Sequence, residues 1–322
     1  MKNEILIADS CAISDESIAL MKSVTGVLQG NARNEEELIK TLQEVIDKDS
    51  IKAIVSDAVS ITAKVMDTTP NLRGILVHGV GVNHIDVAAA TKRKIFVINQ
   101  PGANARSVAE LTIALLLAVT KRITQANFDT KKGNWRPLDF IGLELHGKTL
   151  GIVGLGNIGR IVAEIAKGFE MKVLYYDVIR FENLETELEI QYVNKETLLR
   201  ESDFVTLHVP LIPATKHFIG EKELEMMKET AYLINASRGA VIDEIALISA
   251  LQEKKIAGAA MDVFTNEPVE PENPLLRLKN VVATPHIAFL TDQAIYNVSM
   301  GIAKEAIRII RGETPQNVVN VF

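Results

Sequence analysis

The sequence has 322 residues, of which 47% are hydrophobic and 24% are charged, an ordinary globular balance with room for two domains. Its formal net charge of −6 argues against a nucleic-acid partner, because phosphate recognition requires clustered Lys and Arg side chains. The single cysteine, Cys11, excludes an intrachain disulfide, and the longest apolar stretch, 113–119, is too short to span a bilayer, so we expect a cytoplasmic protein with no membrane partner.

The first hundred residues alternate short β-branched runs with helical patterns. Strands are expected at Ile5–Ala8, Ala53–Val55, Ile75–Val77 and Phe96–Ile98, and a helix at Glu35–Asp47. This alternation is typical of βαβ units around a parallel sheet. A longer helix predicted over Ala103–Arg122 is apolar on nearly all sides beyond Glu110, which indicates a buried helix between two domains.

The alternation restarts after Trp135. Six further strands are predicted, at Thr149–Val153, Lys172–Tyr176, Phe204–His208, Ala231–Asn235, Ala257–Met261 and Val281–Ala283. With helices between most of them, these strands make a complete doubly wound dinucleotide-binding domain. The last helix, Asp292–Arg311, is amphipathic and is followed by Gly312. We expect it to pack against the first domain, so that one domain is inserted into the other.

The strongest local motif is GIVGLGNIGR at 151–160, in which Gly154, Gly156 and Gly159 fill the pattern GxGxxG after a predicted strand. In such loops the first glycine makes the tight turn, the second lets the backbone approach a pyrophosphate, and the third lets helix and strand pack closely. The amides that open the helix, at Asn157 and Ile158, then face the phosphates. The motif therefore predicts a dinucleotide site.

Asp177 ends the next predicted strand, 18 positions after Gly159 (177 − 159). This spacing is close to the ~20 residues expected for a carboxylate that hydrogen-bonds the adenosine ribose. A carboxylate there repels a 2′-phosphate, so the predicted cofactor is NAD rather than NADP. Because Arg180 lies three residues later and is a cation, NADP stays open as an alternative cofactor.

Three predicted strands are followed by loops that carry Arg238, Glu267 and His286. Ligands bind at the carboxyl ends of parallel strands in open α/β sheets. Reduction of a 2-oxo acid needs a cation for the substrate carboxylate and an acid with a pKa near neutrality, and Arg and His suit these roles. Taken singly, Arg238 could equally form a surface ion pair and His286 could be structural, so the prediction rests on the three together.

Five ordered motifs carry a family resemblance: GLGNIG, HVPL at 208–211, NASRGAVID at 235–243, DVFTNEP at 262–268 and TPHIA at 284–288. Over essentially its whole length the chain resembles the D-isomer-specific 2-hydroxyacid dehydrogenases. The resemblance implies hydride transfer between NAD and a small D-2-hydroxy or 2-oxo acid. It also implies an α/β fold of two doubly wound parallel-sheet domains. A Rossmann-like NAD domain (101–289) is inserted into a flavodoxin-like substrate domain (1–100 and 290–322), and a homodimer forms through the NAD domain.

The same resemblance assigns roles to individual residues. Arg238 binds the substrate carboxylate, His286 is the general acid/base, and Glu267 raises the pKa of His286. Asp262 lies at the nicotinamide end of the cofactor, and the other residues expected to line the cofactor are Val209, Ala236, Ser237, His286 and Ala288. In the first domain the backbone amides of Gly79, Val80 and Gly81 cradle the substrate carboxylate. His78 either contacts a second polar group of the substrate or is structural.

Some questions stay open from the sequence. Phe289 and Leu290 follow TPHIA where the family often has a small residue. Either these two side chains narrow the substrate pocket, or Phe289 simply packs between the domains. Trp135 is expected to be a packing anchor or part of a dimer interface.

The substrate could be 3-phosphoglycerate, D-lactate, glyoxylate, hydroxypyruvate or a branched 2-oxo acid. A non-catalytic NAD-sensing corepressor is the alternative outside enzymes. The remaining histidines lack metal-ligand spacing, so no metal is predicted.

Overall fold

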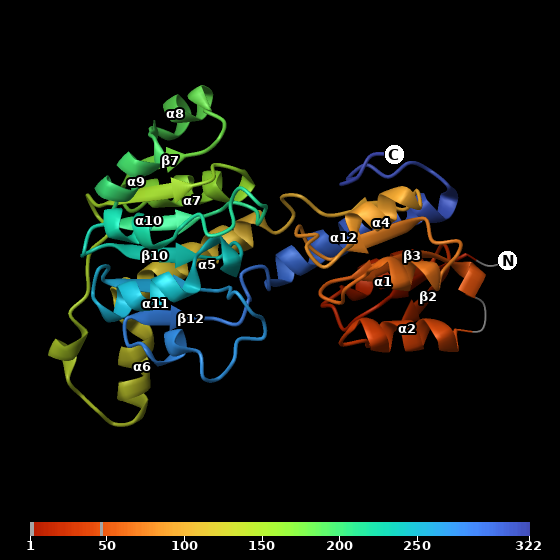
Figure 1. Cartoon of the computed structure of the whole chain (residues 1–322), viewed down its shortest axis with the longest axis horizontal. Helices are drawn as coiled ribbons and strands as arrows, with labels where there is room; N and C mark the ends of the chain where they lie inside the picture. The colour runs from red at the N-terminus through yellow and green to blue at the C-terminus, as the bar shows by residue number, and fades with distance from the viewer. Residues whose placement is uncertain (1–2, 46–47) are drawn as a thin grey trace. The chain divides into compact units, whose positions relative to one another are not determined.

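The computed structural model describes residues 3–45 and 48–322 and divides the chain into two compact units (Figure 1). The first unit consists of Met1–Asn104 and Leu290–Phe322, and the second of Ala105–Phe289. Each unit contains a parallel β-sheet with helices packed against it. The predicted α/β class with two parallel sheets is confirmed.

The sheet of the first unit has five parallel strands in the order β2-β1-β3-β4-β5. The strands are β1 (Glu4–Ile7), β2 (Gly26–Gln29), β3 (Ile51–Ser56), β4 (Gly74–Val77) and β5 (Phe96–Ile98). This 2-1-3-4-5 order is that of flavodoxin-like sheets, with the direction of winding reversing between β1 and β3. Strand β2 was not predicted, because its short GVLQ sequence lies at the sheet edge and none of its residues is fully buried.

The helices of the first unit are α1 (Asp15–Lys22), α2 (Glu35–Glu44), η1 (Lys48–Ser50), α3 (Ala63–Asp67), α4 (Val87–Lys92) and α12 (Asp292–Arg311). Helix α12 has the predicted bounds and packs against α1, β3 and β4. Thr291 caps its first turn by accepting a hydrogen bond from the Ala294 amide, and Gly312 ends it with a left-handed φ of 76°. The predicted end of α2, Asp47, lies outside the described residues.

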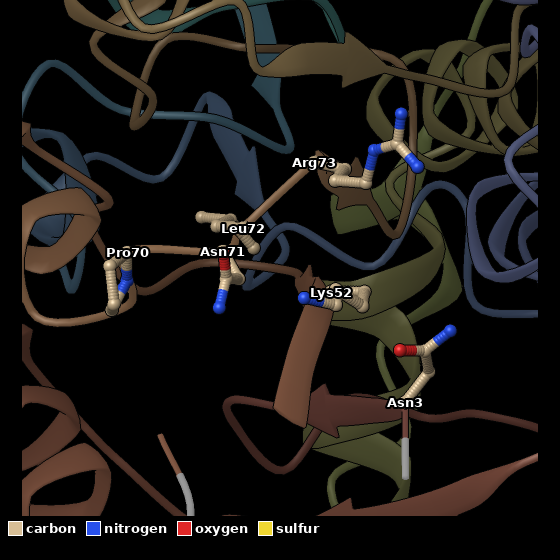
Figure 2. Close-up of a pocket in the computed structure, with 6 residues that line it drawn as sticks. All are labelled: Asn3, Lys52, Pro70, Asn71, Leu72 and Arg73. Carbon is tan, nitrogen blue, oxygen red and sulfur yellow. The ribbon is translucent and has the colours of Figure 1, made fainter. Parts of the chain in front are cut away.

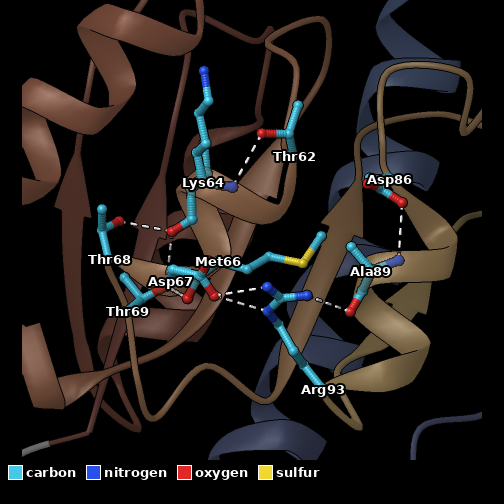
Figure 3. Close-up of polar contacts among 10 residues, drawn as sticks. Thr62, Lys64, Met66, Asp67, Thr68, Thr69, Asp86, Ala89 and Arg93 are labelled. Carbon is cyan, nitrogen blue, oxygen red and sulfur yellow. Dashed lines mark hydrogen bonds and ion pairs between the residues drawn. The ribbon is translucent and has the colours of Figure 1, made fainter.

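A polar cluster joins helices α3 and α4 (Figure 3). The Asp86 carboxylate caps α4 by accepting a hydrogen bond from the Ala89 amide at 2.8 Å. The Arg93 guanidinium donates from Nε to Asp67 at 2.9 Å and from Nη1 to the Ala89 carbonyl at 3.1 Å. Because the Asp67 side chain is 63% exposed, this ion pair contributes at most about 1 kcal/mol.

The second unit has a seven-stranded parallel sheet in the order β12-β11-β10-β9-β6-β7-β8. Its strands are β6 (Thr149–Val153), β7 (Lys172–Tyr176), β8 (Gln191–Tyr192), β9 (Phe204–Leu207), β10 (Tyr232–Asn235), β11 (Gly258–Met261) and β12 (Val281–Ala283). The direction of winding reverses between β6 and β9, as in Rossmann-like domains, where a ligand binds beyond the carboxyl ends of the strands. The two-residue edge strand β8 is one more than the six strands predicted.

The longer helices of the second unit are α5 (Ala105–Thr120), α6 (Ile123–Lys131), α7 (Asn157–Lys167), α8 (Glu182–Leu188), α9 (Lys195–Glu201), α10 (Glu221–Met226) and α11 (Glu244–Gln252). Short 3-10 turns are η2 (Pro137–Phe140), η3 (Gly239–Val241) and η4 (Pro274–Arg277). Helix α5 packs against α7 and strands β10 to β12, which explains its nearly all-round hydrophobicity. The sheet is therefore buried on both faces, and loops at its strand ends are held on a rigid base.

Candidate active site

The glycine loop between β6 and α7 is built by close backbone approaches. A Cβ on Gly154, whose φ is +94°, would lie 2.7 Å from the His208 carbonyl oxygen at the end of β9. A Cβ on Gly159 would lie 2.1 Å from the Gly154 oxygen, which is too close for any side chain. These two glycines are thus required for the packing of β6, β9 and α7, as the sequence motif predicted.

The first turn of α7 offers its backbone amides to a ligand. Its N-cap residue, Gly156, provides no capping side chain, and a Cβ there would meet nothing within 4 Å. Asn157 is exposed at the helix start and Ile158 follows it. An uncapped helix N-terminus with open space in front of it fits the pyrophosphate of a dinucleotide, because unpaired N–H groups and the helix dipole both favour anions.

Asp177 lies just beyond β7 and is tied to the glycine loop. Its carboxylate accepts hydrogen bonds from the Leu155 amide at 2.7 Å and from the Ile179 amide at 3.1 Å. This carboxylate therefore lies beside the glycine loop. Arg180 is bound elsewhere: its Nε and Nη2 donate to the two carboxylate oxygens of Glu185 at 2.8 and 2.9 Å.

Arg238 follows β10 in a loop shaped by Asn235. The Asn235 side chain is fully buried, accepts hydrogen bonds from the Ser237 amide and hydroxyl, and donates to the Arg238 carbonyl at 2.9 Å. Nη1 of Arg238 donates to the Ser237 carbonyl at 2.7 Å, which directs the guanidinium. Asn235 was not among the predicted site residues, although it begins the NASRG motif.

Glycine at position 239 lets the loop that carries Arg238 meet the loop that carries Glu267. A Cβ there would lie 1.9 Å from the Phe264 carbonyl carbon, so only glycine allows the loop after β10 to touch the loop after β11. The Phe264 amide in turn donates to Oε1 of Glu267 at 2.8 Å. The backbone contact thereby connects the position of Arg238 with that of Glu267.

His286 and Glu267 form a direct pair. Nδ1 of His286 lies 2.6 Å from Oε2 of Glu267, and the two side chains are 40% and 35% exposed. Because the carboxylate accepts, Nδ1 carries the proton and Nε2 is the nitrogen left to titrate. His286 has a left-handed φ of 55°, a conformation that costs energy for a residue with a side chain. Its amide donates to the Asp262 carbonyl at 2.8 Å, which helps to hold this conformation.

Asp262 organises the loop that carries His286. Its side chain is fully buried and accepts hydrogen bonds from the Thr284 hydroxyl at 2.6 Å, the Ile287 amide at 3.0 Å and the Ala288 amide at 2.9 Å. The resemblance assigned Asp262 to the nicotinamide end of the cofactor and did not indicate this role. The structure shows that it fixes the residues on both sides of His286.

The charges of the three residues act on one another. The hydrogen bond and negative charge of Glu267 raise the pKa of His286, against the opposing effects of burial and of Arg238. Burial would raise the pKa of Glu267, but hydrogen bonds from His286 and from the Phe264 amide lower it overall. Burial lowers the pKa of Arg238, although Glu267 opposes this. The Glu267 carboxylate thus favours the protonated form of the His286 imidazole, although the Arg238 guanidinium opposes it.

The remaining predicted residues of the second unit lie around these loops. Ala236 and Ala288 are buried and pack in a small cluster with Val108, against which Phe289 also packs. Phe289 therefore has packing partners within its own unit. Val209 follows His208, and its Cγ1 would lie 3.0 Å from a Cβ on Gly154, so it borders the glycine loop.

The predicted substrate loop of the first unit follows β4. Gly79 has a φ of 155° and open space where a Cβ would be, and Val80 is 39% exposed. The Gly79 carbonyl accepts from the Gln100 amide at 2.8 Å, and the Val80 carbonyl accepts from Asn99 at 2.7 Å, so the loop is anchored through its oxygens. Gly81 completes the loop.

His78, by contrast, is only 1% exposed, and its Nε2 lies 3.1 Å from the Ser299 hydroxyl. Burial lowers its pKa to about 4. The histidine is therefore neutral and packed behind the loop in this structure.

Within residues 3–45 and 48–322 there is no group of three or more His, Cys, Asp or Glu side chains that could hold a metal ion. In the same residues no helix is both long enough and apolar enough to cross a membrane.

Comparisons with known proteins agree with this geometry. Residues 113–288 match the family model described as D-isomer specific 2-hydroxyacid dehydrogenase, NAD binding domain. The chain is 47% identical over 286 residues to a glyoxylate reductase of Thermococcus litoralis, covering 87% of this chain and 86% of that protein. It is 41% identical over 319 residues to a D-3-phosphoglycerate dehydrogenase of Archaeoglobus fulgidus, covering 99% of this chain but 59% of that protein.

Among solved structures, the chain resembles the NAD complex of a D-isomer specific 2-hydroxyacid dehydrogenase from Lactobacillus delbrueckii ssp. bulgaricus. The TM-score is 0.76, the sequence identity is 28%, and the match covers 99% of this chain and all of that one.

Proposed function

Because the chain belongs to the D-isomer-specific 2-hydroxyacid dehydrogenase family, we propose that this NAD(P)-binding oxidoreductase reduces a small 2-oxo acid of the glyoxylate type, with His286 as the proton donor. The observation that carries the proposal is the 2.6 Å pair of His286 and Glu267, held in loops next to Arg238. The 45% and 47% identities to glyoxylate reductases favour an enzyme over the non-catalytic corepressor.

Glyoxylate is favoured by the relatives. The matched glyoxylate reductase is 47% identical to this chain, against 41% for the phosphoglycerate dehydrogenase. D-3-phosphoglycerate remains the second candidate, because that relative is still 41% identical.

Arg238, His286 and Glu267 have separate roles in the proposed reaction. When bound, the reduced nicotinamide supplies the hydride that adds to the carbonyl carbon of the acid. Arg238 binds the substrate carboxylate through its fork of N–H groups and polarises the carbonyl. The proton on Nε2 of His286 passes to the carbonyl oxygen, so that the product is the 2-hydroxy acid. Glu267 keeps the imidazole oriented and favours its protonated form.

We propose that NAD is preferred over NADP. The support is the Asp177 carboxylate next to the glycine loop, which would repel a 2′-phosphate. Arg180, the nearby cation that could offset this repulsion, already has both sides of its fork bound to Glu185. The amides of Asn157 and Ile158 are the proposed donors to the pyrophosphate, and Val209, Ala236, Ser237 and Asp262 are retained as proposed neighbours of the nicotinamide end.

For the first unit we propose the role of substrate domain. The amides of Gly79, Val80 and Gly81 would donate to the substrate carboxylate, since two carbonyls of the loop are already turned to other partners. The second unit is then the NAD domain, in agreement with the span of the family model. The single cysteine agrees with the cytoplasmic location that we retain as a proposal.

A homodimer through the second unit is also proposed. Helix α6 and the segment after it expose large apolar side chains, among them Phe128 at 57%, Trp135 at 81% and Leu138 at 81%. An apolar group of this kind is typical of a surface buried in an oligomer. Analytical ultracentrifugation of the wild type and Trp135→Ala tests it, and a wild type that sediments as a monomer at micromolar concentration refutes it.

The test of the activity is a panel of glyoxylate, hydroxypyruvate, pyruvate and 3-phosphohydroxypyruvate with NADH and with NADPH. We expect the highest kcat/KM with glyoxylate and NADH. His286→Gln should lower kcat about 10²–10⁴-fold, the usual contribution of general acid–base catalysis. Full activity of that variant would refute the proposed role of His286, and a preference for 3-phosphohydroxypyruvate would favour the second candidate.

A further inference from the structure

A cavity of about 450 Å³ opens at the amino-terminal edge of the first unit's sheet (Figure 2). It is lined by Asn3, Lys52, Pro70, Asn71, Leu72 and Arg73. Asn3 precedes β1, Lys52 begins β3 and Arg73 precedes β4, and these three strands are neighbours in the sheet. The loop at Gly79 follows the opposite end of β4, so the cavity is separate from the proposed substrate loop.

The two cations of this cavity are paired across the sheet. The Arg73 amide donates to the Lys52 carbonyl at 2.9 Å, and the register places Ala53 opposite Gly74, so Lys52 and Arg73 are direct neighbours. Like charges at paired positions destabilise a sheet. No lining residue carries a carboxylate, and within residues 3–45 and 48–322 neither cation forms an ion pair. No described carboxylate therefore neutralises either cation by direct pairing, and Nη1 of Arg73 lies 3.6 Å from the position of a Cβ on Gly312, at the end of α12.

Hydrogen bonds hold the polar wall in place. Nζ of Lys52 and Nδ2 of Asn71 donate to the same carbonyl oxygen, that of Asp49, at 3.1 and 3.3 Å. Nδ2 of Asn3 donates to the Ile310 carbonyl at 3.4 Å. The ammonium of Lys52 keeps two further donors, and the guanidinium of Arg73 presents a planar fork of five. Such a set matches the oxygen atoms of phosphate and carboxylate groups.

We propose that this cavity binds a small polyanion bearing phosphate or carboxylate groups between Lys52 and Arg73. The depression holds about 450 Å³ and is largely open to solvent, so a hydrated anion can enter it. The lining has no aromatic side chain and is mostly polar, so it offers an apolar ligand little contact area. An anion between the two cations would gain an electrostatic attraction to each of them, which makes the site selective for negative charge.

Isothermal titration of the whole chain with inorganic pyrophosphate, and separately with citrate, tests the proposal at constant ionic strength. The variant Lys52→Gln/Arg73→Gln removes both charges of the cavity. The matched control, Arg33→Gln/Lys64→Gln, removes one Arg and one Lys that are exposed on the same unit outside the cavity. We expect the cavity variant to lose one binding site or at least tenfold in affinity, and the control to bind as the wild type does.

The two ligands distinguish phosphate from carboxylate recognition, since a phosphate site takes up pyrophosphate and not citrate. Pyrophosphate bound at the glycine loop would persist equally in all three proteins, which separates it from the cavity. Equal isotherms for wild type, cavity variant and control overturn the proposal, as does a wild type without saturable binding. Thermal unfolding gives a second readout: the ligand should raise the wild-type Tm by about 2–4 °C and leave that of the cavity variant unchanged. Turnover of the 2-oxo acid panel should be the same in all three proteins, so a failure here is distinct from a failure of the proposed activity.

Discussion

Replacing Asp262 with Asn removes the acceptor that holds the His286 loop. The carboxylate accepts from Thr284 and Ile287 on one oxygen and from Ala288 on the other. An Asn side chain keeps one oxygen and turns an NH2 group toward the second position. In either orientation a buried N–H, that of Ile287 or of Ala288, faces another donor.

The expected cost follows from these contacts. A buried donor left unpaired costs about 1–3 kcal/mol, and hydrogen bonds to a charged group are worth about 1.5–3 kcal/mol. A loss of about 2 kcal/mol changes a local opening equilibrium about 30-fold, because 1.4 kcal/mol corresponds to tenfold. The amides of Ile287 and Ala288 should exchange with solvent about 30-fold faster. Since the loop carries His286, kcat/KM should also fall by about tenfold.

Hydrogen exchange followed by mass spectrometry on peptides spanning 283–290 measures this opening. Thr284→Val is the control, because it removes only the 2.6 Å hydroxyl bond and leaves both amides their acceptor. We expect that variant to accelerate exchange no more than about fivefold, for a loss of about 1 kcal/mol. Exchange in Asp262→Asn within twofold of the wild type would show that the carboxylate does not hold the loop.

Four further changes test the site. Glu267→Gln removes the anion that raises the pKa of His286, so that pKa should fall and the alkaline limb of the pH profile of kcat/KM for reduction should move to lower pH; a limb that stays in place would separate the two residues functionally. Asp177→Ala should shift the ratio of kcat/KM for NADH and NADPH toward NADPH, and an unchanged ratio would remove Asp177 from cofactor selection. Arg238→Lys keeps the charge but loses the fork, so KM for the oxo acid should rise and kcat should fall, whereas wild-type kinetics would contradict carboxylate binding by Arg238. Phe289→Ala should lower activity by a similar factor for short and long 2-oxo acids, because Phe289 packs within its unit; a selective gain with long acids would place it in the pocket instead.

Much of the fold was accessible from local patterns. The bounds predicted for helix α12 agree with the structure, because its amphipathic face and the Gly312 that follows it are local signals. Strands β2 and β8 were missed, because short edge strands bury few side chains and leave little hydrophobic pattern. The glycine loop was recognised because the steric demands at Gly154 and Gly159 also appear as a spacing in the sequence.

What the sequence by itself determined was the class of the fold and the glycine loop of the dinucleotide-binding domain. Strand-end position and residue chemistry, which can be deduced along the chain, also led to the prediction of Arg238, Glu267 and His286 as the catalytic residues. Only the tertiary structure decided how these residues are held. Asn235 and Asp262 bind partners by hydrogen bonds across loops, and Gly239 is required by a neighbouring backbone that no local pattern indicates. The pairing of Lys52 with Arg73 depends likewise on strand register. Such features arise from contacts between distant segments, and their physical basis exists only after the sheets have formed.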